Sequence, residues 1–287
     1  MLICEDGAVV GSLSAGCVEN EVVECAREVL QAGEPVVLSF DTRRRFGCAG
    51  KIDILIERIH HEFFADLAES LGSRRPCVAV TTNRGTIVAA MEWKSGRAPP
   101  HSKTQPGKLS EQCSGAFETP KNTALLMQEI HPPMGLLIFG DGPDSRPFHL
   151  LGNLLGWEVI VVIDPDIAIE ADQWTAAIVK SHNYGRDFAA LEKLLPLELR
   201  YVGLIGPRKR RDQLLNDLLE VGVTINAGFF APAGLDLGAE TPEEIALAVV
   251  SEIQRVFGGG SGESLRERKM PIHVPVECAD TSAPSKR

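Results

Sequence analysis

Gly135-Leu-Leu-Ile-Phe-Gly140-Asp-Gly142-Pro-Asp-Ser145 is the stretch of sequence that decides the fold. Its apolar start is typical of a buried parallel strand, and the glycines that follow allow a tight turn into a helix. A helical pattern to about Leu155, a second apolar run at 157–163 and then Asp164 complete the layout. Asp164 stands about 20 residues after the turn, where a carboxylate can bind a ribose. The spacing therefore predicts the first βαβ unit of a Rossmann-like domain.

The acidic turn argues against a tightly held dinucleotide. Ser145 replaces the third glycine of the dinucleotide fingerprint, and Asp141 and Asp144 place negative charge where a pyrophosphate would lie. Two interpretations of the turn remain open: a dinucleotide site that uses its glycines and Asp164, or a fold kept as a scaffold. We expect dinucleotide binding to be weak or absent.

Three polar residues near later strand-like runs are further candidates for a ligand site. His182 follows the run 176–181, where open α/β sheets place ligands, or it is a structural histidine. Arg208 begins a basic helix after the run 200–206, and it either binds a phosphate or belongs to a solvated basic face. Asp236, in a glycine-rich turn, either orients a ligand or caps its own backbone. We expect the histidine to share one sheet edge with the acidic turn.

Two cysteines at glycine-rich turns distinguish the N-terminal half. Cys17 precedes apolar residues at helical spacing, so it should lie in the first turn of a helix, where the dipole favours a thiolate. Cys48 falls in a turn of small residues between the strand-like runs 35–40 and 52–57. We expect the two thiols to line one side of a cleft. The alternative is a pair of buried or incidental cysteines, because free cysteine is among the most buried residue types.

The same two turns resemble the N-terminal motifs of the XdhC/CoxI family, the xanthine dehydrogenase accessory proteins. The family usually reads Ser-Gly-Gly-Cys-Val/Leu-Glu and Gly-Cys-Gly-Gly, where this chain has Ser14-Ala-Gly16-Cys-Val-Glu19 and Gly47-Cys-Ala-Gly50. The likeness continues at 181–187, 200–208 and 232–244. Family members usually carry a further segment ahead of the part matched here, so we expect a late or trimmed start. An exposed strand edge would then favour pairing of two chains as a homodimer.

The resemblance implies a two-domain α/β accessory protein that binds molybdenum cofactor (molybdopterin). It would support sulfuration of the cofactor by a cysteine desulfurase and deliver it to a molybdenum hydroxylase such as xanthine dehydrogenase. Thiolates suit a soft, sulfur-rich metal centre, so Cys17 and Cys48 are the candidate molybdenum contacts. The candidate cofactor-binding residues are Ser14, Gly16, Cys17, Glu19, Gly47, Cys48, Gly50, Gly140, Gly142, Asp144, Asp164, His182, Arg208 and Asp236.

Two other classes of function stay open. The spacing of the residues identifies no constellation of catalytic base, nucleophile and oxyanion donors, so we interpret the chain as a chaperone rather than an enzyme. One alternative is an NAD(P)-dependent oxidoreductase that uses the Rossmann-like domain. The other is an interaction module that bridges a desulfurase and a hydroxylase without holding cofactor.

Composition limits the partners and the compartment. The 287 residues suffice for an N-terminal domain at 1–122 with a mobile linker from about 94, a Rossmann-like domain at 123–258 and a disordered tail at 259–287. A net charge of −10 at pH 7 opposes binding to nucleic acid or to an anionic membrane. Seven cysteines without a CxxC pair indicate reduced thiols, and no apolar run has membrane-spanning length, so we expect a cytoplasmic protein.

Overall fold

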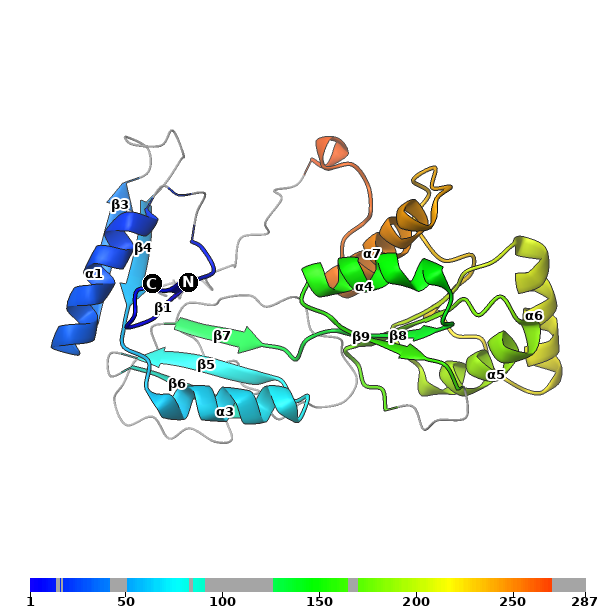
Figure 1. Ribbon diagram of the computed structural model, residues 1–287, viewed down its shortest axis with the longest axis horizontal. Helices are drawn as coiled ribbons and strands as arrows, with labels where there is room; N and C mark the ends of the chain where they lie inside the picture. The colour runs from blue at the N-terminus through cyan, green and yellow to red at the C-terminus, as the bar shows by residue number, and fades with distance from the viewer. Residues whose placement is uncertain are drawn as a thin grey trace, which may run out of the picture. The chain divides into compact units, whose positions relative to one another are not determined.

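A computed structural model (Figure 1) gives the structure of residues 1–13, 16, 18–41, 51–82, 85–90, 126–164 and 170–269. The chain divides into two compact units, and each is described by itself. The described part of the first unit lies within 1–90 and 126–130, and that of the second within 131–269. No helix in these ranges is both long and apolar enough to cross a membrane.

Five parallel strands form the sheet of the second unit. In sheet order they are β12 (Phe229–Phe230), β11 (Tyr201–Leu204), β10 (Thr175–Val179), β8 (Gly135–Phe139) and β9 (Glu158–Val162). The first strand of the unit, β8, thus lies between the second and the third, which is a doubly wound order with its switch point between β8 and β10. The predicted Rossmann-like α/β fold is confirmed.

Helices cover both faces of this sheet because its side chains alternate between two apolar clusters (Figure 1). One face packs against α4 (Arg146–Leu154) and α7 (Pro242–Gly258), through Phe148 and Val249 among others. The other face packs against α5 (Tyr184–Leu194) and α6 (Arg208–Glu220). Short 3-10 turns complete the unit: η1 (Pro143–Ser145), η2 (Leu195–Leu197) and η3 (Leu265–Glu267).

The last helix has defined ends. Thr241 accepts a hydrogen bond from the backbone N–H of Glu244, whose side chain accepts in return from the Thr241 N–H, so the two residues form a capping box. Gly259 ends the helix in the left-handed conformation. Of the expected tail, the structure describes residues 259–269, which include η3.

The first unit is built from short antiparallel pairs. These are β1 (Leu2–Ile3) with β2 (Val9–Val10), β3 (Val36–Asp41) with β4 (Lys51–Ile56), and β5 (Cys77–Thr82) with both β6 (Gly85–Ala90) and β7 (Leu126–Ile130). The boundary between the units falls after Ile130 rather than after residue 122, because β7 pairs with β5.

The described part of the first unit also contains two helices: α1 (Glu19–Ala32) and α3 (His61–Gly72). The buried side of α1 presents Val22, Ala26 and Val29 at helical spacing. They pack against Phe40 of β3 and Ile56 of β4. This helix-on-hairpin core therefore follows from the apolar pattern of the sequence.

Candidate functional site

The carboxyl ends of β8 and β10 bring two loops together in the second unit. Phe139 and Val179 are register partners at the ends of these parallel strands. The chain therefore leaves both strands at one edge of the sheet, into the turn 140–145 and the segment 180–183. This edge lies at the switch point of the strand order, where doubly wound sheets place ligands.

Lys180 joins the two loops. Its ammonium, wholly buried, donates to Oδ1 of Asp144 and to Oγ of Ser145, each at 2.9 Å. Ser145 Oγ in turn donates to the carbonyl of Gly140 at 2.8 Å. Lys180 is not among the residues predicted from the sequence, although a lysine directly after the apolar run 175–179 of a buried strand must find an anionic partner.

His182 reaches the same carboxylate from the exposed side. Its Nε2 lies 3.2 Å from Oδ2 of Asp144, and its backbone is in the left-handed region at φ 56°. Desolvation raises the pKa of Asp144, but the hydrogen bonds and charges of Lys180 and His182 outweigh it and hold that pKa below its usual range. The prediction that His182 shares an edge with the acidic turn is confirmed.

Both glycines of the turn are explained by contacts inside the protein. Gly140 has φ 136°, and a Cβ there would lie 2.8 Å from the carbonyl oxygen of Lys180. A Cβ on Gly142 would meet Asp144 Oδ1 at the end of that side chain. The Asp144 carboxylate therefore folds over the turn and occupies the space beside Gly142. This carboxylate, rather than open backbone, is what the turn presents to a ligand.

A second buried carboxylate fixes the loop after β10. Asp187 is fully buried, and its Oδ1 accepts from Ser181 N at 3.0 Å and from Ser181 Oγ at 2.5 Å. Its Oδ2 pairs with Arg210 from α6. Asp187 thus holds the segment next to His182 in place, which makes it a positioning residue.

Three other predicted residues of the second unit are exposed. Asp164 is exposed and follows β9 at the same sheet edge. Arg208 is exposed at the start of α6, and Asp236 is exposed in the loop between β12 and α7. Within the described residues, no hydrogen bond or ion pair joins Arg208 or Asp236 to Asp144.

Most of the two cysteine motifs lies outside the described residues. This is so for Ser14, Cys17, Gly47, Cys48 and Gly50. The predictions that place Cys17 in a first helical turn and both thiols beside one cleft are therefore still predictions.

Two other residues of the first cysteine motif are described. Gly16 has φ 99°, a conformation that favours glycine. Glu19 is the first residue of α1, and its Oε2 accepts from Val18 N at 3.1 Å. Among the residues that the structure describes, no group of three or more histidine, cysteine or acidic side chains could hold a metal ion.

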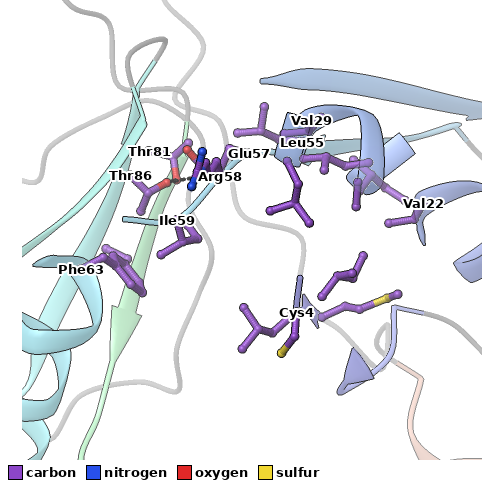
Figure 2. Close-up of a pocket in the computed structure, with 18 of the residues that line it drawn as sticks. Cys4, Val22, Val29, Leu55, Glu57, Arg58, Ile59, Phe63, Thr81 and Thr86 are labelled. Carbon is purple, nitrogen blue, oxygen red and sulfur yellow. Dashed lines mark hydrogen bonds between the residues drawn. The ribbon is translucent and has the colours of Figure 1, made fainter. Parts of the chain in front are cut away.

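The first unit contains a cavity of about 590 Å³ that the sequence did not reveal (Figure 2). Its walls come from β1, α1, β4, α3 and the sheet of β5, β6 and β7. Figure 2 shows Val22, Val29 and Leu55 on one side and a polar group with Glu57 on the other. The volume lies within the roughly 300–1,000 Å³ of small-molecule sites.

Two family models match the chain. One is described as the XdhC Rossmann domain and matches residues 136–253, and the other is described as the XdhC and CoxI family and matches residues 1–41. The chain belongs to the XdhC and CoxI family. The two matches fall in different units, so both units of this XdhC chain carry the family pattern.

Relatives of this XdhC chain match along most of its length. A protein of Bacillus subtilis (strain 168), named as a probable subunit of xanthine dehydrogenase, is 28% identical over 293 residues, which cover 88% of this chain and 86% of that one. "Uncharacterized protein YqeB" of Escherichia coli (strain K12) is 23% identical, over 94% of this chain and 42% of that one. A crystal structure described as a xanthine dehydrogenase from Bacillus halodurans matches 93% of this chain and 86% of that one, with a TM-score of 0.67. At 23% identity, that match shows the fold alone.

Proposed function

We propose that this chain is an accessory protein of a molybdenum hydroxylase of the xanthine dehydrogenase type. It binds molybdenum cofactor, supports sulfuration of the cofactor by a cysteine desulfurase and delivers the cofactor to the apo-enzyme. The family matches at 1–41 and 136–253 support this role, as does a relative named for xanthine dehydrogenase that aligns with 88% of the chain.

The position of Asp144 is the observation that favours an accessory role over a dinucleotide-dependent enzyme. In a dinucleotide site the glycine-rich turn leaves room for a pyrophosphate, and its N–H groups attract negative charge. Here the Asp144 carboxylate already lies over Gly142 and already pairs with Lys180. A pyrophosphate would meet a carboxylate there and would have to displace it from the lysine.

The residues of the chain fit the molybdenum cofactor in two respects. Cys17 and Cys48 provide soft donors of the kind that suit molybdenum and sulfur chemistry. Glu57 presents a buried carboxylate oxygen without a hydrogen-bond partner to the cavity of the first unit, where a pterin N–H could be accepted. When bound, the cofactor supplies a molybdenum centre on which an oxo ligand is exchanged for a sulfido ligand.

Expression in a host that makes molybdenum cofactor tests the proposal. Metal and pterin analysis of the purified protein should find both molybdenum and pterin. Cys17→Ala and Cys48→Ala should lose cofactor and client activation, because each variant removes a soft sulfur donor. We expect little loss of stability in either variant. The control is Cys25→Ala, within α1, which should retain cofactor. A parent protein free of molybdenum and pterin would contradict the proposal.

The Rossmann-like fold of the second unit keeps an NAD(P)-dependent oxidoreductase as the second candidate function. Calorimetry with NAD(H) and NADP(H) separates the two candidates. We expect weak or absent binding, because Asp144 fills the turn and Asp141 is exposed beside it. Submicromolar affinity would favour the oxidoreductase.

A further inference from the structure

One end of the cavity in the first unit is polar. Glu57, which directly follows β4, is the central residue of this polar end. Thr86 of β6 donates a hydrogen bond to Glu57 Oε1. The Thr86 hydroxyl is itself 2.7 Å from that of Thr81 on β5. Figure 2 shows these three side chains together on one side of the cavity. The Glu57 carboxylate is therefore oriented before any ligand arrives.

The other oxygen of this carboxylate lacks a partner. Glu57 Oε2 is buried and has no hydrogen bond within the described residues. The neighbouring Arg58 does not supply one, because its guanidinium faces Glu5 at 3.7 Å and both side chains are largely exposed. A buried acceptor without a donor is costly, so the cavity is suited to a ligand that brings a donor.

The remaining walls restrict the kind of ligand. They are mostly aliphatic, with Val22 and Val29 from α1 and Leu55 from β4, and Phe63 of α3 adds an aromatic ring. A ligand whose only donor is an ammonium group would lose its hydration against these walls and gain one carboxylate as its partner. Such a ligand fits the cavity poorly. A flat ring with N–H donors along one edge matches both the walls and the two oxygens of a carboxylate.

We propose that this cavity binds a planar bicyclic heterocycle through an edge that carries an amino group next to a ring N–H. Guanine and pterin share this edge, and Glu57 accepts from it with both oxygens. The inference deepens the proposed function and rests on it in one respect: the pterin of the molybdenum cofactor is the source that an accessory role would use. Glu57 is then the residue that recognises the ring, and Thr86 positions it.

Direct binding to the purified full chain tests the site without any client enzyme. Pterin and guanosine are titrated against the protein, with pterin fluorescence and calorimetry as readouts. Lumazine and inosine, which lack the amino group of pterin and guanosine respectively, should bind at least about tenfold more weakly, since a hydrogen bond to a charged group is lost. This comparison uses the parent protein alone, so it does not depend on the folding of a variant.

Variants then locate the site. Glu57→Gln should weaken pterin binding at least about tenfold, because its amide N–H₂ faces the donors of the ring. The matched control is Glu62→Gln on α3, an acidic residue outside the cavity lining, which should bind as the parent does. Tighter binding of pterin than of guanosine identifies the cofactor as the source, and the reverse order identifies a guanine nucleotide.

The outcomes separate this inference from the proposed function. If neither pterin nor guanosine binds, or if lumazine and inosine bind as tightly as their amino counterparts, the inference is wrong. If the parent carries molybdenum cofactor and Glu57→Gln carries as much, the cavity is not the pterin site while the accessory role stands. If the parent carries no cofactor but still binds the heterocycle through Glu57, the accessory role fails and the cavity assignment stands.

Discussion

Removing either partner of the Asp144–Lys180 ion pair should destabilise the second unit by different amounts, because the two groups are buried to different extents. The Lys180 side chain is 0% exposed, whereas that of Asp144 is 27% exposed. Asp144→Ala leaves a buried ammonium with Ser145 as its described acceptor, and breaking a buried pair in this way costs about 3–5 kcal/mol. Lys180→Met leaves a carboxylate that water and His182 still reach, so we expect about 1.5–3 kcal/mol, the value of one hydrogen bond to a charged group.

Urea unfolding measures this difference when the fluorescence comes from the second unit alone. Trp157 and Trp174 are buried there, and a Trp93→Phe background removes the third tryptophan of the chain. We expect the unfolding midpoint to fall further for Asp144→Ala than for Lys180→Met, at an unchanged m-value. The double variant should lose less stability than the sum of the two single losses, because it leaves no unpaired charge.

The pH dependence of the same variants gives an independent check. Because the folded-state pKa of Asp144 is depressed, its ion pair contributes stability above the unfolded pKa and loses it as the pH falls through the folded pKa. The difference in free energy of unfolding between the parent and Asp144→Ala should therefore have its full size at pH 7 and become smaller below about pH 4. Two results would contradict this account of the ion pair: Lys180→Met proves the more destabilising variant, or the difference in unfolding free energy between the parent and Asp144→Ala stays constant as the pH is lowered.

Three further results are expected from the second unit. Desolvation together with the hydrogen bond and charge of Asp217 raises the pKa of Tyr184 to about 12, and desolvation together with Glu252 raises that of Tyr201. Absorbance of the folded chain should therefore show no tyrosinate near pH 10, whereas that of the urea-unfolded chain should. Asp187→Asn should lower the free energy of unfolding in urea by about 3 kcal/mol, because Arg210 loses its buried counter-charge; a loss under about 1 kcal/mol would contradict this. Thr241→Ala should cost about 1 kcal/mol in the same assay by removing the N-cap of α7, and an unchanged midpoint would contradict it.

The fold of the second unit was predictable because local patterns and tertiary contacts agree. The apolar run at 135–139 is buried at every residue, as a central parallel strand requires. The Thr241–Glu244 capping box is likewise a contact between residues three apart, so the sequence carries it directly. Where the partners of an element are its neighbours in the chain, a sequence pattern is sufficient.

The polar clusters were harder to predict because their partners are distant in the chain. Lys180 meets Asp144 across 36 residues, and Thr86 meets Glu57 across 29. Each of these residues by itself resembles an ordinary polar position in or near a strand. Only the pairing of strands brings them together, and strand order cannot be derived from spacing alone. The cavity of the first unit escaped prediction for the same reason, since several separate elements line it.

The glycines of the acidic turn show why a motif can indicate the right fold and the wrong ligand. A dinucleotide fingerprint attributes its glycines to the close approach of a phosphate. In this chain Gly140 is required because the backbone of Lys180 lies against it, whereas a side chain at position 142 would meet only the end of the Asp144 side chain. Gly140 is thus demanded by strand-end packing, and the space beside Gly142 is taken by an internal carboxylate. An external anion that used this turn would have to displace Asp144 from Lys180. The more stable the Asp144–Lys180 ion pair is, the more strongly the turn opposes binding of such an anion.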